Sequence, residues 1–103
     1  MNDFIYRINF TLPADDKERV TIQGTEKGLT DVVLDVHGLK CSQARKIINN
    51  MLNISRQKFR LVVIHGFHGG TAIKDMIPKM HNEHIIDIQK NRTNPGMTYI
   101  LAA

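Results

Sequence analysis

The stretch Leu61–Thr71, with the sequence LVVIHGFHGGT, decides the fold of this chain. Its first four residues are apolar and predict a buried strand, and the glycines that follow predict a turn. The next segment has apolar residues at the i, i+3, i+4, i+7 spacing of an amphipathic helix: Ile73, Met76, Ile77 and Met80. A glycine turn between a strand and a helix suits an anion, because the first backbone N–H groups of a helix are unpaired. The same pattern also fits an ordinary strand-to-helix turn.

A second copy of this pattern precedes the first. Residues 32–38, VVLDVHG, form an apolar run that ends in His-Gly, and an apolar helical stripe follows at Cys41, Ala44, Ile47, Ile48, Met51 and Leu52. His37 and His65 thus take the same place in two successive strand–helix units, 28 positions apart. This distance fits one strand, one helix and their loops, so the two strands are expected to be parallel. Both His-Gly turns should then lie at the carboxyl edge of the sheet, where open α/β folds bind ligands.

Length and composition indicate one globular domain. The chain has 103 residues, of which 42% are hydrophobic and 23% charged. No apolar run is long enough to span a membrane, and we expect neither a signal peptide nor a membrane partner. The single cysteine, Cys41, excludes an internal disulfide framework and favours a reducing, cytoplasmic location. It falls on the apolar stripe, so we interpret it as a core residue rather than a nucleophile.

The charge is distributed unevenly along the chain. Residues 1–31 contain four Lys or Arg and six Asp or Glu, whereas residues 32–103 contain ten and four. The basic excess therefore lies in the part with the two His-Gly turns. This is the sign expected of a protein that binds a polyanion, although many basic domains bind none.

Residues 1–30 are interpreted as an N-terminal extension. Residues 4–10 and 19–22 are candidate strands, residues 13–16 predict a turn, and residues 24–30 resemble a polar linker. A hairpin packed on the main sheet is the first interpretation. A flexible arm is the alternative, as is an edge that forms a homodimer, because an unpaired apolar strand invites a partner.

The remaining elements predict an α/β fold, a two-layer α+β sandwich with a β-α-β-α-β-β core and a mixed four-stranded sheet. Pro78 is expected to kink or shorten the second helix, because proline lacks a backbone N–H. The last strand is expected to run antiparallel to the one before it. The predicted strands are residues 32–37, 59–64, 84–89 and 97–101, and the predicted helices are residues 40–55 and about 71–80.

Three short motifs in the same region resemble those of the small MutS-related (Smr) domain family. Residues 34–39, LDVHGL, resemble the Leu-Asp-x-His motif that opens these domains. His65-Gly66 and the glycines after it resemble the His-Gly-x-Gly motif, and residues 94–98, NPGMT, resemble the closing Asn-x-Gly-x-Thr motif. The motifs occur in the order of the family and cover residues 32–102, so residues 31–103 are interpreted as an Smr-like domain.

The resemblance implies a two-layer α/β fold similar to the C-terminal domain of bacterial initiation factor three. It also implies nucleic-acid binding, and several members of the family nick DNA or cut RNA. The chain departs from the family at one position, because His68 stands where the second motif has its second glycine.

Asp35 and His37 are candidate catalytic residues. They are two positions apart on a strand, so their side chains should point to the same face. A carboxylate beside a histidine can fix its tautomer and raise its basicity, so that His37 takes a proton from a water or a ribose hydroxyl. The same pair can instead share a divalent cation such as Mg²⁺ with a phosphate. His65 is the third candidate, as a ligand of a phosphate oxygen or a proton donor to the leaving group.

Other residues around the two turns are candidates for contacts to phosphate: Gly66, His68, Gly69, Gly70, Lys74 and Arg92. Phe67 is expected either to stack on a base or to cover the sheet edge.

Two functions therefore remain open at the level of the sequence. The first is an endonuclease that nicks or cleaves DNA or RNA. The second is a module that binds nucleic acid without cutting it. The Asp-x-His pair favours the endonuclease, because binding alone needs no carboxylate near a phosphate, whereas His68 in the glycine position favours the binding module.

Overall fold

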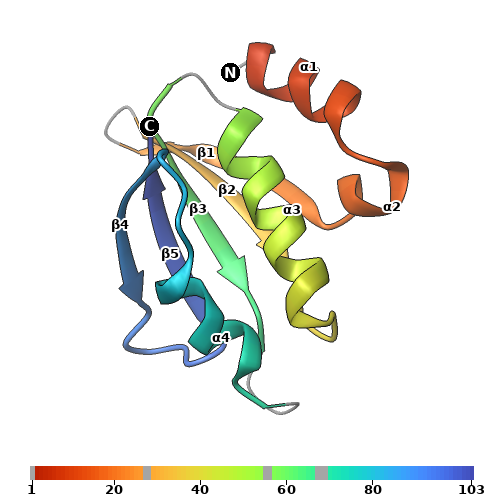
Figure 1. Ribbon diagram of the computed structural model, residues 1–103. Helices are drawn as coiled ribbons and strands as arrows, with labels where there is room; N and C mark the ends of the chain where they lie inside the picture. Colours follow the sequence, from red (N-terminus) through yellow and green to blue (C-terminus); the bar gives the residue numbers. More distant parts are fainter. Residues whose placement is uncertain (1, 27–28, 55–56, 67–69) are drawn as a thin grey trace.

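The computed structural model describes residues 2–26, 29–54, 57–66 and 70–103. Its five strands form one mixed sheet in the order β1-β2-β3-β5-β4 (Figure 1). The elements in chain order are α1 (Asn2–Thr11), α2 (Ala14–Lys17), β1 (Val20–Glu26), β2 (Leu29–Asp35), α3 (Cys41–Ile54), β3 (Phe59–Ile64), α4 (Ala72–Met76), the 3₁₀ helix η1 (Ile77–Lys79), β4 (Ile85–Lys90) and β5 (Met97–Ala102).

The predicted parallel pair forms the centre of the sheet. β2 and β3 are parallel, with Val32 paired to Leu61 and Asp35 to Ile64. β5 is antiparallel to both β3 and β4, as expected for the last strand. The four strands of the predicted core are all present, and β1 adds a fifth strand along the free edge of β2. Because β4 runs in the same direction as β3, the loop after β4 lies at the same carboxyl edge as the ends of β2 and β3.

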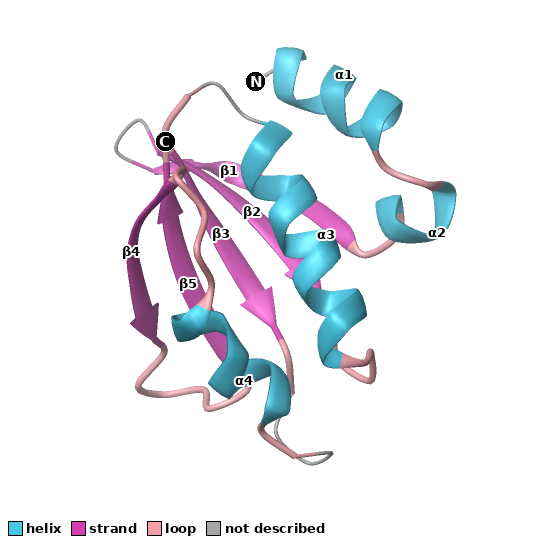
Figure 2. Cartoon of the chain, viewed as in Figure 1, coloured by secondary structure: helices cyan, strands magenta, loops and turns pink. Residues whose placement is uncertain are grey.

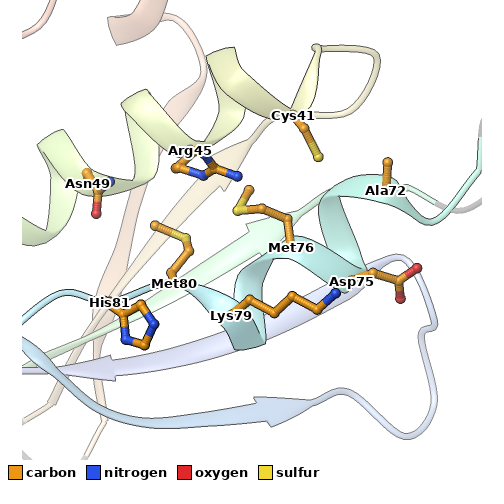
Figure 3. Close-up of a pocket in the computed structure, with 9 residues that line it drawn as sticks. All are labelled: Cys41, Arg45, Asn49, Ala72, Asp75, Met76, Lys79, Met80 and His81. Atoms are coloured by element: carbon orange, nitrogen blue, oxygen red, sulfur yellow. The ribbon is translucent and has the colours of Figure 1, made fainter.

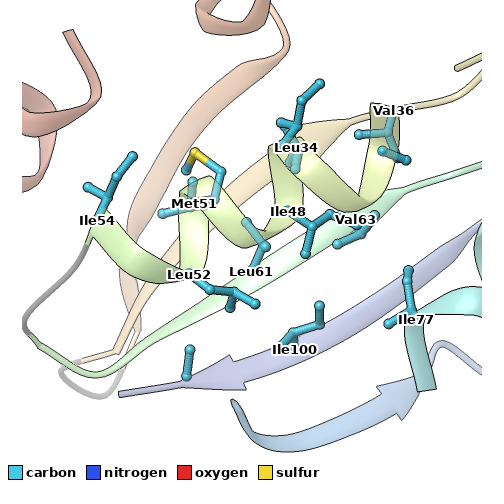
Figure 4. Packing of buried hydrophobic residues seen from close by; sticks show 14 of the residues in the cluster. Leu34, Val36, Ile48, Met51, Leu52, Ile54, Leu61, Val63, Ile77 and Ile100 are labelled. Atoms are coloured by element: carbon cyan, nitrogen blue, oxygen red, sulfur yellow. The ribbon is translucent and has the colours of Figure 1, made fainter. Parts of the chain in front are cut away.

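The hydrophobic core lies between the sheet and the helices. Alternate residues of the strands are buried on one face, as in the cross-strand row Val32, Leu61 and Ile100. The helices α3 and α4 cover this face, so that the chain folds in two layers (Figure 2). The layers meet in a cluster that includes Leu34, Val36, Ile48, Met51, Leu52, Val63 and Ile77 (Figure 4). This arrangement confirms the predicted α+β sandwich.

The prediction of a strand at residues 4–10 is wrong, since this segment belongs to the helix α1. Ile8 lies in α1, and Leu12, directly after its last residue, donates its backbone N–H to Ile8 O at 3.1 Å, so both lie on the same side of the helix. Both are buried in the core cluster, and α1 packs against α3. The alternation of apolar and polar residues suggested a strand, but packing against the neighbouring helix α3 favours a helix here.

The prediction of a polar linker at residues 24–30 is also wrong. β1 continues to Glu26 and β2 begins at Leu29, and these two residues pair across an antiparallel hairpin. The register shifts between Gln23 and Thr25, which places the bulge at Gly24, a residue type that tolerates an irregular backbone. The N-terminal part of the chain thus contributes a strand of the sheet itself.

The second predicted helix is divided into two short pieces. The α-helical part ends at Met76 and continues as η1, which contains Pro78. This confirms the expected effect of Pro78, which cannot donate an α-helical hydrogen bond. Throughout the described ranges, no helix has the length and apolar character needed to cross a membrane.

Candidate functional site

The three motifs meet at the carboxyl edge of the parallel pair. The backbone N–H of Val36 donates to Ile64 O at 2.9 Å, which ties the end of β2 to the end of β3. The N–H groups of His65 and Gly66 both donate to Gly96 O, at 2.9 and 3.1 Å. Residues that are distant in the sequence thus form one hydrogen-bonded edge.

Asp35 and His37 form a close pair at this edge. His37 Nδ1 lies 2.5 Å from Asp35 Oδ1, and the backbone N–H of His37 donates to the same oxygen at 3.1 Å. Because a carboxylate accepts hydrogen bonds, Nδ1 carries the proton in the neutral imidazole, and Nε2 then has the lone pair. The His37 side chain is 67% exposed and that of Asp35 is 40% exposed. The pair therefore presents an oriented imidazole nitrogen to solvent.

His65 has a different environment from His37. It is only 6% exposed, and both ring nitrogens have partners. Nδ1 donates to Gly66 O at 2.8 Å, which leaves Nε2 to accept from the hydroxyl of Thr98 at 2.9 Å. The ring thus joins the His-Gly turn to the strand that carries the last motif. Its direct action on a phosphate stays a prediction.

Two glycines allow these turns to approach each other closely. Gly66 has φ +70°, a conformation that side chains rarely adopt, and a Cβ at this position would lie 3.5 Å from His37 Cβ. A Cβ at Gly96 would lie 3.3 Å from Gly66 Cα and 3.3 Å from Asn94 Oδ1. The backbone of the His-Gly turn is therefore packed tightly between the first and the last motif.

The remaining predicted contacts to phosphate lie around this edge or outside the described residues. Lys74 is half-buried on α4, and Arg92 is exposed in the loop between β4 and β5. Gly70 is exposed with φ +105° just before α4. His68 and Gly69 lie outside the described residues, as does Phe67.

The structure adds three residues that sequence reasoning missed. Asp15, Glu18 and Arg19 line a hollow together with Asp35. The backbone N–H of Asp35 donates to Arg19 O at 2.9 Å. The guanidinium of Arg19 in turn donates to Asp35 O at 3.4 Å. The sequence gives a signal for Arg19 alone, which begins the candidate strand at residues 19–22, and it does not show that this strand pairs beside Asp35.

Asp35 and His37 supply two potential metal ligands. Within the ranges that the structure describes, no group of three or more His, Cys, Asp or Glu side chains is placed to hold a metal ion. A bound cation at this pair would need its other ligands from water or from a phosphate.

The three motifs that resemble those of the small MutS-related family converge at this edge of the sheet, and comparison with known proteins agrees with the resemblance. The chain is 38% identical over 60 residues to the ribosome rescue factor SmrB of Buchnera aphidicola subsp. Baizongia pistaciae (strain Bp). The matched region is 56% of this chain and 34% of the relative, so the chain spans about a third of the length of the relative it matches. This similarity confirms the resemblance to the small MutS-related family.

No protein-family model matches the chain. No solved structure matches it either.

Proposed function

We propose that this chain is an Smr-type domain that binds nucleic acid and cleaves its phosphodiester bonds at the Asp35–His37 pair. The hydrogen bond from His37 Nδ1 to Asp35 Oδ1, at 2.5 Å on an exposed edge, is the observation that carries the proposal. The relative is named a ribosome rescue factor, and ribosomes are largely RNA, so RNA is the favoured substrate. We also propose a cytoplasmic location on this ground.

The proposed chemistry follows from the tautomer of His37. Nε2 accepts a proton from the attacking hydroxyl, either of water or of the ribose 2′ position, as its oxygen bonds to phosphorus. The bond to the leaving oxygen then breaks, and that oxygen takes a proton from solvent or from the imidazolium. Asp35 stabilises the positive charge that His37 carries between these two steps.

The other predicted residues bind the phosphate chain or position the turns in this proposal. Arg92 and Lys74 hold the phosphate chain by charge, and the backbone of Gly66 and Gly70 lets it approach closely. His65 positions the turn through Thr98, and its ring is already used by two partners. A direct role of His65 would require it to exchange one of these partners for a phosphate.

A binding module without cleavage is the second candidate. His68 favours it, because a histidine stands where the second motif of the family has its second glycine. In this case Asp35 and His37 would act only as contacts to the nucleic acid.

One incubation separates the two candidates. Labelled single-stranded and double-stranded DNA and RNA are incubated with the full chain, with and without Mg²⁺, and the products are resolved by length. We expect cleavage of RNA, and a 2′-deoxy nucleotide at the cut position would show whether the ribose hydroxyl is the nucleophile. Binding without cleavage of any of these substrates would leave the binding module.

A further inference from the structure

A groove between α3 and α4 starts at the same edge of the sheet as the Asp35–His37 pair. Each helix begins after one strand of the parallel pair, so Cys41 on α3 and Ala72 on α4 mark the end of the groove that faces this edge. The groove has a volume of about 530 Å³ and extends to Asn49 and His81. From Cys41 to Asn49, α3 rises on the order of 12 Å, which gives the groove room for a short extended ligand.

The floor and the walls of the groove differ in chemistry. Figure 3 shows the side chains of Met76 and Met80 pointing toward α3 and forming an apolar floor. Arg45 stands on the α3 side, and Lys79 and His81 stand on the other.

Arg45 and Lys79 are the two basic side chains of the groove besides His81. Within the part of the chain that the structure describes, no hydrogen bond or ion pair joins either of their side chains to another residue. The single carboxylate of the groove, Asp75, accepts a hydrogen bond from the hydroxyl of Thr71 at 2.8 Å. The groove thus offers free positive charge above an apolar surface.

We propose that this groove binds single-stranded nucleic acid that extends from the Asp35–His37 pair, and this inference rests on the proposed function. Phosphates pair with Arg45 and Lys79, which lie on opposite walls. The polarisable sulfur atoms of Met76 and Met80 contact the flat faces of bases or the sugars. A single strand fits better than a duplex, because only unpaired bases can turn toward the floor.

Charge-matched variants test the groove. Arg45→Gln with Lys79→Gln is compared with Lys46→Gln with Lys58→Gln, since Lys46 and Lys58 are exposed and do not line the groove. Binding of a fluorescein-labelled 12-nucleotide single-stranded RNA is followed by anisotropy at several salt concentrations. His37→Ala is present in all proteins, so that the RNA is not cut during the measurement.

We expect the groove variant to reduce the slope of log affinity against log salt by about 1.4, since each phosphate contact contributes about 0.7 on a single strand. The control pair should reduce it much less. With His37 restored, the groove variant should raise KM and leave kcat nearly unchanged, because the groove only binds. Equal slopes for the two variant pairs would overturn the inference.

Cys41 gives an independent probe, because it is the only cysteine and it lines the groove. Saturating RNA should slow its alkylation by iodoacetamide severalfold. RNA that binds without protecting Cys41 would overturn the groove inference but leave the proposed function intact. Absence of any RNA binding would overturn both. Equal protection by poly-glutamate would overturn the assignment to nucleic acid and point to an acidic protein segment.

Discussion

Thr98 links the last motif to the second through its side chain. Its hydroxyl donates to the Nε2 atom of His65, and both residues are buried. Thr98→Val removes the donor and leaves a buried nitrogen without a partner, which should lower the free energy of unfolding by about 1–3 kcal/mol. Urea denaturation measures this change.

Thr21→Val serves as the control, because Thr21 is exposed on β1. It should change the free energy of unfolding by less than about 0.5 kcal/mol. If Thr98→Val proved as stable as the wild type, the ring of His65 would not depend on this hydrogen bond.

The two histidines show what sequence patterns can predict about single residues. The closeness of Asp35 and His37 follows from their spacing of two, since the end of a strand brings such side chains to one face. The environment of His65 depends on Thr98, which is 33 positions away. No local pattern contains this pairing, so the burial of His65 could not be derived from the sequence.

At the scale of elements, α1 depends on its contact with α3. Leu12, just after α1, is 3% exposed and belongs to the core. Leu12→Ala should therefore lower the free energy of unfolding by about 2–4 kcal/mol, because it removes buried apolar volume. Thermal or urea denaturation of the full chain measures the loss.

Phe10→Ala is the matched control for Leu12→Ala. Phe10 is 76% exposed, and its ring contacts Tyr6 at 4.8 Å between centroids. Its removal should change the free energy of unfolding by less than about 1 kcal/mol. Similar losses in both variants would mean that α1 does not pack on α3 as described.

The elements from β2 to β5 were largely predictable, and the N-terminal ones were not. The strand–glycine–helix pattern occurs twice in succession, and the strands of its two copies are the ones that pair. The parallel pairing of β2 with β3 therefore follows from the sequence. The helix α1 is stabilised by packing on α3, and the strand β1 is stabilised by pairing with β2. Both contacts are made with residues later in the chain, so the local sequence does not show them. The division into residues 1–30 and 31–103 stays a prediction, as does a homodimer through the N-terminal segment.

At the scale of the whole molecule, charge decides how a nucleic acid can approach. Asp15 and Glu18 face the hollow beside Asp35, so they should repel phosphates at the proposed site. Asp15→Asn with Glu18→Gln should therefore tighten binding of single-stranded RNA, roughly two- to fivefold at low salt. Fluorescence anisotropy measures the dissociation constant.

Glu83 provides the control for this pair of substitutions. Its side chain is 90% exposed, and it precedes β4, at the opposite edge of the sheet. Glu83→Gln should change the affinity less than either acidic residue beside Asp35. An equal gain from Glu83→Gln would show that only net charge matters and that the nucleic acid does not lie at this edge.

The most direct test compares cleavage and binding of one RNA substrate by the wild type, His37→Ala and Asp35→Asn. His37→Ala should lower the cleavage rate by about 10²–10⁴-fold, because it removes the proton acceptor. The dissociation constant should change by less than about tenfold, which corresponds to about 1.4 kcal/mol. Asp35→Asn should give a smaller loss of rate, because the ring keeps its position and loses only its anionic partner. Equal losses of rate and affinity in His37→Ala would contradict the catalytic role and make His37 a phosphate contact.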